Sequence, residues 1–79
     1  MKDVNKQIIN FIIEYRLEKK ISPSLQDIAE EFGISKQAMG KRIERLIRLG
    51  FITKFDGVAR SWLITPKGYS WIGGGNNGI

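Results

Sequence analysis

The segment 24–50 constrains the fold most, because it contains two helical patterns separated by only a few residues. Ser24 is a good N-cap for the first helix, and Gly33 fits the left-handed position that ends a helix after about two turns. Ser35 is a second N-cap, and the helix that it starts ends near Gly50. A connection this short sets the two helices at a steep angle to each other, which predicts a helix-turn-helix unit.

Each of these two helices has one apolar side, so both need further elements to complete a core. The apolar residues of the first are Leu25, Ile28, Ala29 and Phe32, and those of the second are Met39, Ile43, Leu46, Ile47 and Leu49. The opposite side of the second helix carries Gln37, Lys41, Glu44, Arg45 and Arg48, with Lys36 in the first turn. The helix 36–49 therefore presents its cations on the side that the core does not use.

The N-terminal region predicts a third helix, over residues 3–20. One apolar stripe of this helix consists of Val4, Ile8, Phe11, Ile12 and Tyr15, and a second, narrower stripe consists of Ile9, Ile13 and Leu17. A helix in a small bundle needs one buried stripe, so the second stripe requires a partner.

A hairpin and a short helix follow the basic helix. Segments 51–55 and 61–65 are rich in β-branched and aromatic residues around the turn signal Asp56-Gly57, which predicts two strands with a loop over 56–60. Thr65-Pro66 starts a short helix that contains Tyr69, Trp71 and Ile72. We therefore predict a mainly helical α+β fold, a winged helix-turn-helix over residues 1–72, with a disordered tail over 73–79.

The composition excludes most small-protein chemistry. The 79 residues contain no cysteine and no histidine, so they form no disulfide, zinc finger or Ser-His-Asp triad. The acidic residues Asp27, Glu30 and Glu31 are interpreted as solubilising charge on an exposed helix side. The residues after Met1 predict no signal peptide, and there is no run of the roughly 18 apolar residues that span a bilayer. We expect no enzyme, no cofactor, no metal and no membrane partner. The expected location is the cytoplasm, on the nucleoid, and the protein could be encoded by a virus or plasmid as readily as by a chromosome.

The excess positive charge lies in one part of the chain. Residues 1–35 hold five Lys/Arg and six Asp/Glu, a balance of −1, whereas residues 36–79 hold eight and two, a balance of +6. Such asymmetry in a small domain indicates a polyanionic partner, and the alternative is a solubilising surface without a ligand.

From about Ile8 to Ile64 the chain resembles the N-terminal winged-helix domain of LexA-type SOS repressors. The stretches that carry the resemblance are Ile21-Ser22-Pro23-Ser24, Asp27-Ile28-Ala29, Phe32-Gly33-Ile34-Ser35, the end of the basic helix from Leu46 to Gly50, and Gly57 to Arg60. The resemblance implies sequence-specific binding of double-stranded DNA by a transcriptional regulator. The helix 36–49 is then expected in the major groove and the wing 56–60 on the DNA backbone or in the minor groove.

The resemblance also implies roles for individual residues. The candidates for contact with bases are Ser35, Gln37, Ala38 and Lys41; Gln37 suits adenine, and the Ala38 methyl suits the methyl of thymine. The candidates for contact with the DNA backbone are Lys36, Arg45, Arg48, Lys54 and Arg60.

Two features depart from LexA-type repressors. Those proteins continue into a self-cleaving Ser-Lys protease and dimerisation domain, whereas these 79 residues stop before one, so self-cleavage is not expected. The helix from Thr65 onward is more similar to MarR-type regulators. Its residues Tyr69, Trp71 and Ile72 and the stripe Ile9, Ile13 and Leu17 either cover one another in a monomer or meet across a twofold axis. The homodimer is favoured because paired half-sites compensate for a small interface.

Other interpretations remain open at this point. A winged helix also serves as a protein-protein module in replication, recombination or other nucleoprotein assemblies, although its exposed helix side is then less basic. Close packing against a neighbouring helix is the favoured reason for Gly40 over close approach to DNA, and Trp62 is interpreted as core or half-buried. Left-handed DNA is not favoured as a ligand, because Gly40 and Glu44 stand where the Z-DNA-binding winged helices carry asparagine and tyrosine.

Overall fold

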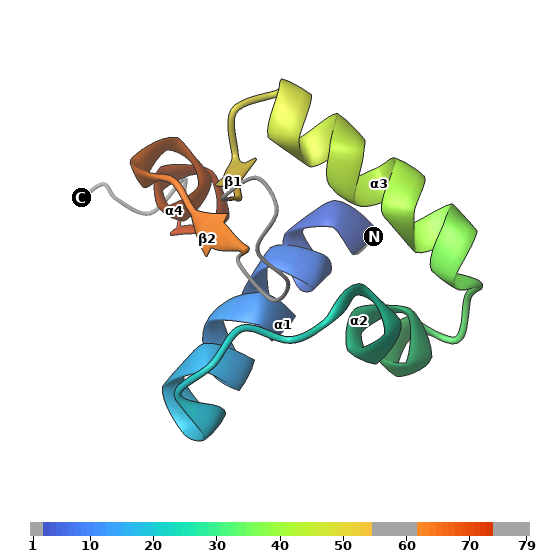
Figure 1. Cartoon of the computed structure of the whole chain (residues 1–79). Coiled ribbons are helices and arrows are strands. Elements are labelled where there is room, and N and C mark those ends of the chain that lie inside the picture. The colour runs from blue at the N-terminus through green and yellow to red at the C-terminus, as the bar shows by residue number, and fades with distance from the viewer. Residues whose placement is uncertain (1–2, 55–61, 74–79) are drawn as a thin grey trace.

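The computed structural model describes residues 3–54 and 62–73, and it has the architecture of a winged helix-turn-helix (Figure 1). Its elements are, in order, α1 (Val4–Lys19), α2 (Leu25–Phe32), α3 (Lys36–Arg48), β1 (Ile52–Thr53), β2 (Leu63–Ile64) and α4 (Pro66–Gly73). The predicted fold class is confirmed. The predicted turn Asp56-Gly57, the loop 56–60 and the tail from residue 74 onward lie outside the described residues. Within the described ranges, no helix is long and apolar enough to cross a membrane.

The helices start at the N-caps that the sequence indicates. Ser24 and Asp27 form a complete capping box at the start of α2, and the Ser35 hydroxyl accepts a hydrogen bond from the Ala38 N–H at 3.1 Å. Gly33 ends α2 in the left-handed conformation with φ of 68°. Gly33 and Ser35 together fix the length of the turn between α2 and α3.

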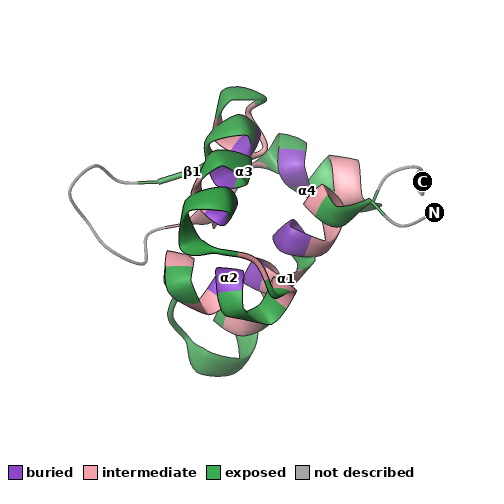
Figure 2. Cartoon of the chain, turned by 90° about the vertical axis from the view of Figure 1, so that its right-hand side faces the viewer, coloured by how far each residue is buried: buried purple, intermediate pink, exposed green. Residues whose placement is uncertain are grey.

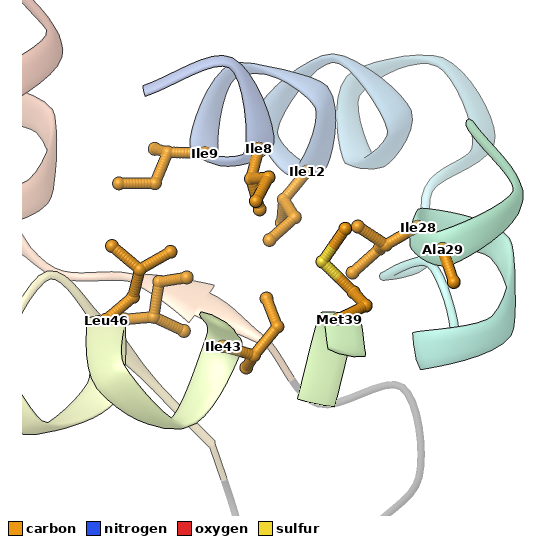
Figure 3. Packing of buried hydrophobic residues seen from close by; sticks show 9 residues of the cluster. Ile8, Ile9, Ile12, Ile28, Ala29, Met39, Ile43 and Leu46 are labelled. Carbon is orange, nitrogen blue, oxygen red and sulfur yellow. The ribbon is translucent and has the colours of Figure 1, made fainter. Parts of the chain in front are cut away.

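The core lies where α1, α2, α3 and β1 meet (Figure 3). Its fully buried residues are Ile8, Ile9 and Ile12 of α1, Ile28 and Ala29 of α2, Met39, Ile43 and Leu46 of α3, and Ile52 of β1. Two predicted core positions are wrong: Val4 is 40% exposed, and Leu49 is 47% exposed because it follows the last residue of α3. The buried side of α1 also lies between the two predicted stripes, since Ile9 is buried as completely as Ile8.

The two strands pair antiparallel and are shorter than predicted. Ile52 lies opposite Ile64 and Thr53 opposite Leu63. Phe51 lies before β1, where its N–H donates to the Leu46 carbonyl at 3.0 Å and its carbonyl accepts from the Thr65 N–H at 3.1 Å. The Phe51 carbonyl therefore continues the register of the hairpin, in which Phe51 lies opposite Thr65, while its N–H ties the hairpin to the end of α3.

α4 packs against α1 and β2 (Figure 1). The Trp71 ring stacks on Phe51 with ring centroids 4.3 Å apart, and the Lys6 ammonium lies 5.1 Å from the centroid of Trp71. The Lys67 ammonium donates to the Leu49 carbonyl at 2.9 Å, a favourable position for a cation at the C-terminus of a helix. These contacts hold α4 against Phe51, α1 and the Leu49 carbonyl at the C-terminal end of α3.

This packing changes the interpretation of the second stripe of α1. Ile9 is fully buried, and Ile13, Trp71 and Ile72 are half-buried against the same core within one chain. Leu17 is 68% exposed and Tyr69 is 53% exposed, so these two residues are not buried in the packing of α4 against α1. The apolar stripe on which the expected homodimer rested is therefore largely used inside the monomer.

A hydrogen-bonded cluster ties the base of the hairpin to the helices. The Ser22 side chain is almost fully buried, and its hydroxyl donates to the Trp62 carbonyl at 2.8 Å. The Arg16 guanidinium donates to the Ser22 hydroxyl at 2.9 Å and to the Trp62 carbonyl at 3.2 Å. Ser22 therefore links α1 and the segment before α2 to the residue before β2.

Replacing Ser22 by alanine is expected to lower the free energy of unfolding by about 1–2 kcal/mol, because the substitution removes a buried hydroxyl that both donates and accepts. Urea denaturation of Ser22→Ala checks this value, with Ser70→Ala as a control on an exposed side of α4. Equal stability of the two variants would show that the cluster does not contribute.

Candidate nucleic-acid interface

α3 is the element that carries most of the predicted contact residues, and it separates them cleanly from the core. Met39, Ile43 and Leu46 are buried on its inner side (Figures 2 and 3). The residues on its outer side and at its cap are exposed: Ser35, Lys36, Gln37, Ala38, Lys41, Arg42, Glu44, Arg45 and Arg48. Because the core side fixes the rotation of α3, the outer side has a defined direction relative to the rest of the domain.

The first turns of α3 border a shallow depression that we call the N-terminal hollow. It is lined by Ser35, Gln37, Ala38, Gly40, Lys41 and Glu44. The hollow brings together all four residues predicted to contact bases. Ser35 also has a structural role, because its hydroxyl caps α3.

A second depression, the basic hollow, lies between α3 and the start of α1. Its lining consists of Asn5, Ala38, Lys41, Arg42, Glu44, Arg45 and Arg48. Four of these side chains are cations, and Glu44 is the one acidic residue of α3. The basic hollow is therefore a region of positive potential next to the N-terminal hollow.

Two residues of the basic hollow, Arg42 and Asn5, were not among the predicted contacts. Arg42 lies at the edge of the outer side of α3, between Ala38 and Arg45 on the helix surface. Its helical spacing from these two residues could have indicated that it belongs to the same surface. No sequence pattern could have placed Asn5 in this hollow, because only the packing of α1 brings it beside α3.

Gly40 is half-buried on the side of α3 that faces α2. A β-carbon added at this position would lie 3.6 Å from the Cδ2 atom of Leu25, which is an ordinary van der Waals contact. Gly40 therefore lies beside a neighbouring helix, as predicted, but the spacing does not require glycine, since alanine also fits between α2 and α3.

The remaining predicted contacts lie at the hairpin. Lys54 is exposed, and its ammonium is 5.5 Å from the ring centroid of Trp62. Trp62 is half-buried, and among the described residues its indole Nε1 atom is buried without a hydrogen-bond partner. Arg60, the wing arginine, lies outside the described residues.

Acidic side chains gather in another depression, between α1 and α2. It is lined by Phe11, Glu14, Tyr15, Glu18, Lys19, Asp27, Glu30 and Glu31. Asp27 is more than a solubilising charge, because its carboxylate accepts from the Ser24 N–H at 3.0 Å and from the Tyr15 hydroxyl at 3.2 Å. The domain therefore keeps most of its acidic groups away from the outer side of α3.

Three helices, a two-stranded wing and an exposed basic second helix of a helix-turn-helix define a winged-helix DNA-binding domain. Residues 2–61 match the model of the LexA DNA binding domain, and the chain belongs to this family. The resemblance found in the sequence is thus confirmed. α4 follows the matched segment.

A curated relative supports the same assignment. The LexA repressor of Oleidesulfovibrio alaskensis is 29% identical over 62 residues, which cover 78% of this chain and 30% of the repressor. The chain thus spans about three tenths of the length of that relative. The similarity concerns the DNA-binding domain.

Proposed function

We propose that this chain binds double-stranded DNA in a sequence-specific manner as a transcriptional regulator, with α3 in the major groove. The observation that carries the proposal is the exposed outer side of α3, which presents Lys41, Arg45 and Arg48 opposite the buried Met39, Ile43 and Leu46. An α-helix fits the major groove, and a helix held by its core side enters with its outer side toward the base pairs. The protein would act on the nucleoid in the cytoplasm.

The basic hollow is the proposed site for the DNA backbone. Duplex DNA carries one charge per roughly 1.7 Å of its axis, and each neutralised phosphate releases condensed counterion. Arg42, Arg45 and Arg48 line this hollow and are all exposed, so their guanidinium groups are accessible to phosphate oxygens. We add Arg42 to the backbone contacts proposed from the sequence, which are Lys36, Arg45, Arg48, Lys54 and Arg60.

The N-terminal hollow is the proposed site for base edges. Gln37 has an amide that pairs with the N6 and N7 groups of adenine, Lys41 donates to guanine acceptors, and the Ala38 methyl packs on the methyl of thymine. All three side chains are exposed and line the same hollow. Binding of two copies to the half-sites of a palindrome remains part of the proposal, independent of the stripe now covered by α4.

The charge of α3 favours DNA over a protein partner. The core of a protein-protein interface is depleted of charged residues and enriched in aromatic residues, although arginine is also common in such interfaces. The outer side of α3 has no aromatic residue and carries a lysine between the two hollows, at Lys41. A winged helix that docked onto protein through α3 would bury this charge without an evident partner.

Replacing Gln37 by alanine is expected to change sequence preference more than overall affinity, because the amide reads a base and carries no charge. One lost bidentate contact corresponds to about 1–3 kcal/mol of discrimination at one base pair. Selection from a randomised duplex library with wild type and Gln37→Ala checks this. An equal loss of affinity on every sequence would refute the assignment of Gln37 to a base.

A further inference from the structure

Gly40 is the residue of the N-terminal hollow that the internal structure does not explain. Glycine in the middle of a helix is less favourable than alanine, a cost that a packing, conformational or functional role would offset. Packing gives no reason, because the added β-carbon would make an ordinary contact at 3.6 Å with Leu25. Conformation gives none either, since among the described glycines only Gly33 and Gly50 have positive φ.

The position of Gly40 indicates a contact with a ligand. On the surface of α3, Gln37 precedes Gly40 by one turn and Glu44 follows it by one turn, so both flank it on the same side. These three residues line the N-terminal hollow together with Ser35, Ala38 and Lys41. Gly40 is half-buried, and because it has no side chain its α-carbon lies at the edge of this hollow, next to Gln37, a residue proposed to read a base.

The chemical character of the surface at Gly40 indicates which group of the DNA packs there. In the middle of a helix the N–H and C=O groups are bonded within the helix, so the accessible surface at Gly40 is its apolar α-carbon. The apolar group on base edges of the major groove is the C5 methyl of thymine.

We propose that Gly40 is a specificity-determining residue, at which the methyl group of a thymine packs against the α-carbon of α3. The inference rests on the proposed function, because it requires α3 to lie in the major groove. The added methyl of Gly40→Ala would occupy the space of the thymine methyl and hold that base pair away from the helix.

The test starts from the best site that wild type selects from a randomised duplex library. Each thymine of that site is replaced by deoxyuridine, which removes the methyl alone, and affinities are measured for wild type, Gly40→Ala and Gly73→Ala. Gly73→Ala is the matched control, because Gly73 belongs to α4 and a β-carbon there meets nothing within 4 Å. Thermal unfolding and binding to a non-cognate duplex are measured for the same proteins.

The expected result has three parts. Gly40→Ala binds the best site roughly 5- to 100-fold more weakly, as for one mismatched base pair, while its affinity for the non-cognate duplex is unchanged because no charge is lost. Wild type loses affinity on one deoxyuridine site, and Gly40→Ala is insensitive to that same replacement. The Tm of Gly40→Ala rises by about 4–8 °C, since alanine favours the helix.

Several results would overturn the inference. Equal affinity of wild type and Gly40→Ala for the best site would do so, as would an equal loss on cognate and non-cognate duplexes. A fall in the Tm of Gly40→Ala would assign the glycine to internal packing instead. If wild type itself binds no duplex, the proposed function fails, and that outcome is seen without any variant.

Discussion

Replacing Gly68 by alanine is expected to lower the free energy of unfolding by about 2–3 kcal/mol, the upper part of the range found for overpacked cores. Gly68 is the buried residue of α4, and a β-carbon there would lie 2.3 Å from the Phe51 carbonyl oxygen and 2.7 Å from the Cγ2 atom of Ile64. Backbone cannot yield as a flexible side chain does, so α4 must move away from β1 and β2. A domain of about 80 residues has only a few kcal/mol to lose.

Urea denaturation followed by tryptophan fluorescence measures this loss, because Trp71 stacks on Phe51 and reports directly on α4. Gly73→Ala supplies the control, since it adds the same methyl to the same helix with no atom within 4 Å. Ordinary surface substitutions change the free energy of unfolding by no more than about 0.5 kcal/mol. A change that small for Gly68→Ala would contradict the close packing of α4 on the Phe51 carbonyl.

The double substitution Arg45→Gln and Arg48→Gln is expected to have the largest effect on DNA binding. Both guanidinium groups are exposed in the basic hollow and are proposed to contact phosphates. Because each phosphate contact contributes about 0.9 to the slope of log K against log salt concentration, the slope should become shallower by about two units. Glutamine keeps the length and polarity of the side chains, so the variant removes charge with little change of shape.

The matched control is the double substitution Lys19→Gln and Lys20→Gln, which changes the net charge by the same amount. These lysines are exposed at the C-terminal end of α1. The basic hollow is instead lined by the N-terminal end of α1 and by α3 (Figure 1). The control should leave the salt slope nearly unchanged. If both double variants lower the slope equally, the basic hollow has no special role and net charge alone attracts the DNA.

Local signals predicted much of this fold because they act over a few residues. Ser24 with Asp27 and Ser35 satisfy the free N–H groups of a helix start, and Gly33 relieves the strain of a left-handed residue. Lys20 shows the limit of such signals: it ends α1 with φ of 67° although it is not glycine. The sequence pattern alone extended the helix through that residue.

Contacts between distant segments were harder to predict. The burial of Ile9 and the place of Asn5 in the basic hollow depend on the packing of α4 and α3 against α1, which no local pattern encodes. The reason for Gly40 depended on the distance to Leu25, a residue of another helix. The outer side of α3 was predictable in contrast, because its period follows from the helix itself.

The central claim is that the outer side of α3 binds DNA, and a titration of the wild-type chain against a randomised duplex library at two salt concentrations tests it most directly. Sequencing of the bound fraction then shows which sites are enriched. We expect enrichment of a defined sequence, with affinity that falls steeply as salt rises. Absence of binding even at low salt would contradict the claim and would indicate a protein partner for the cations of α3.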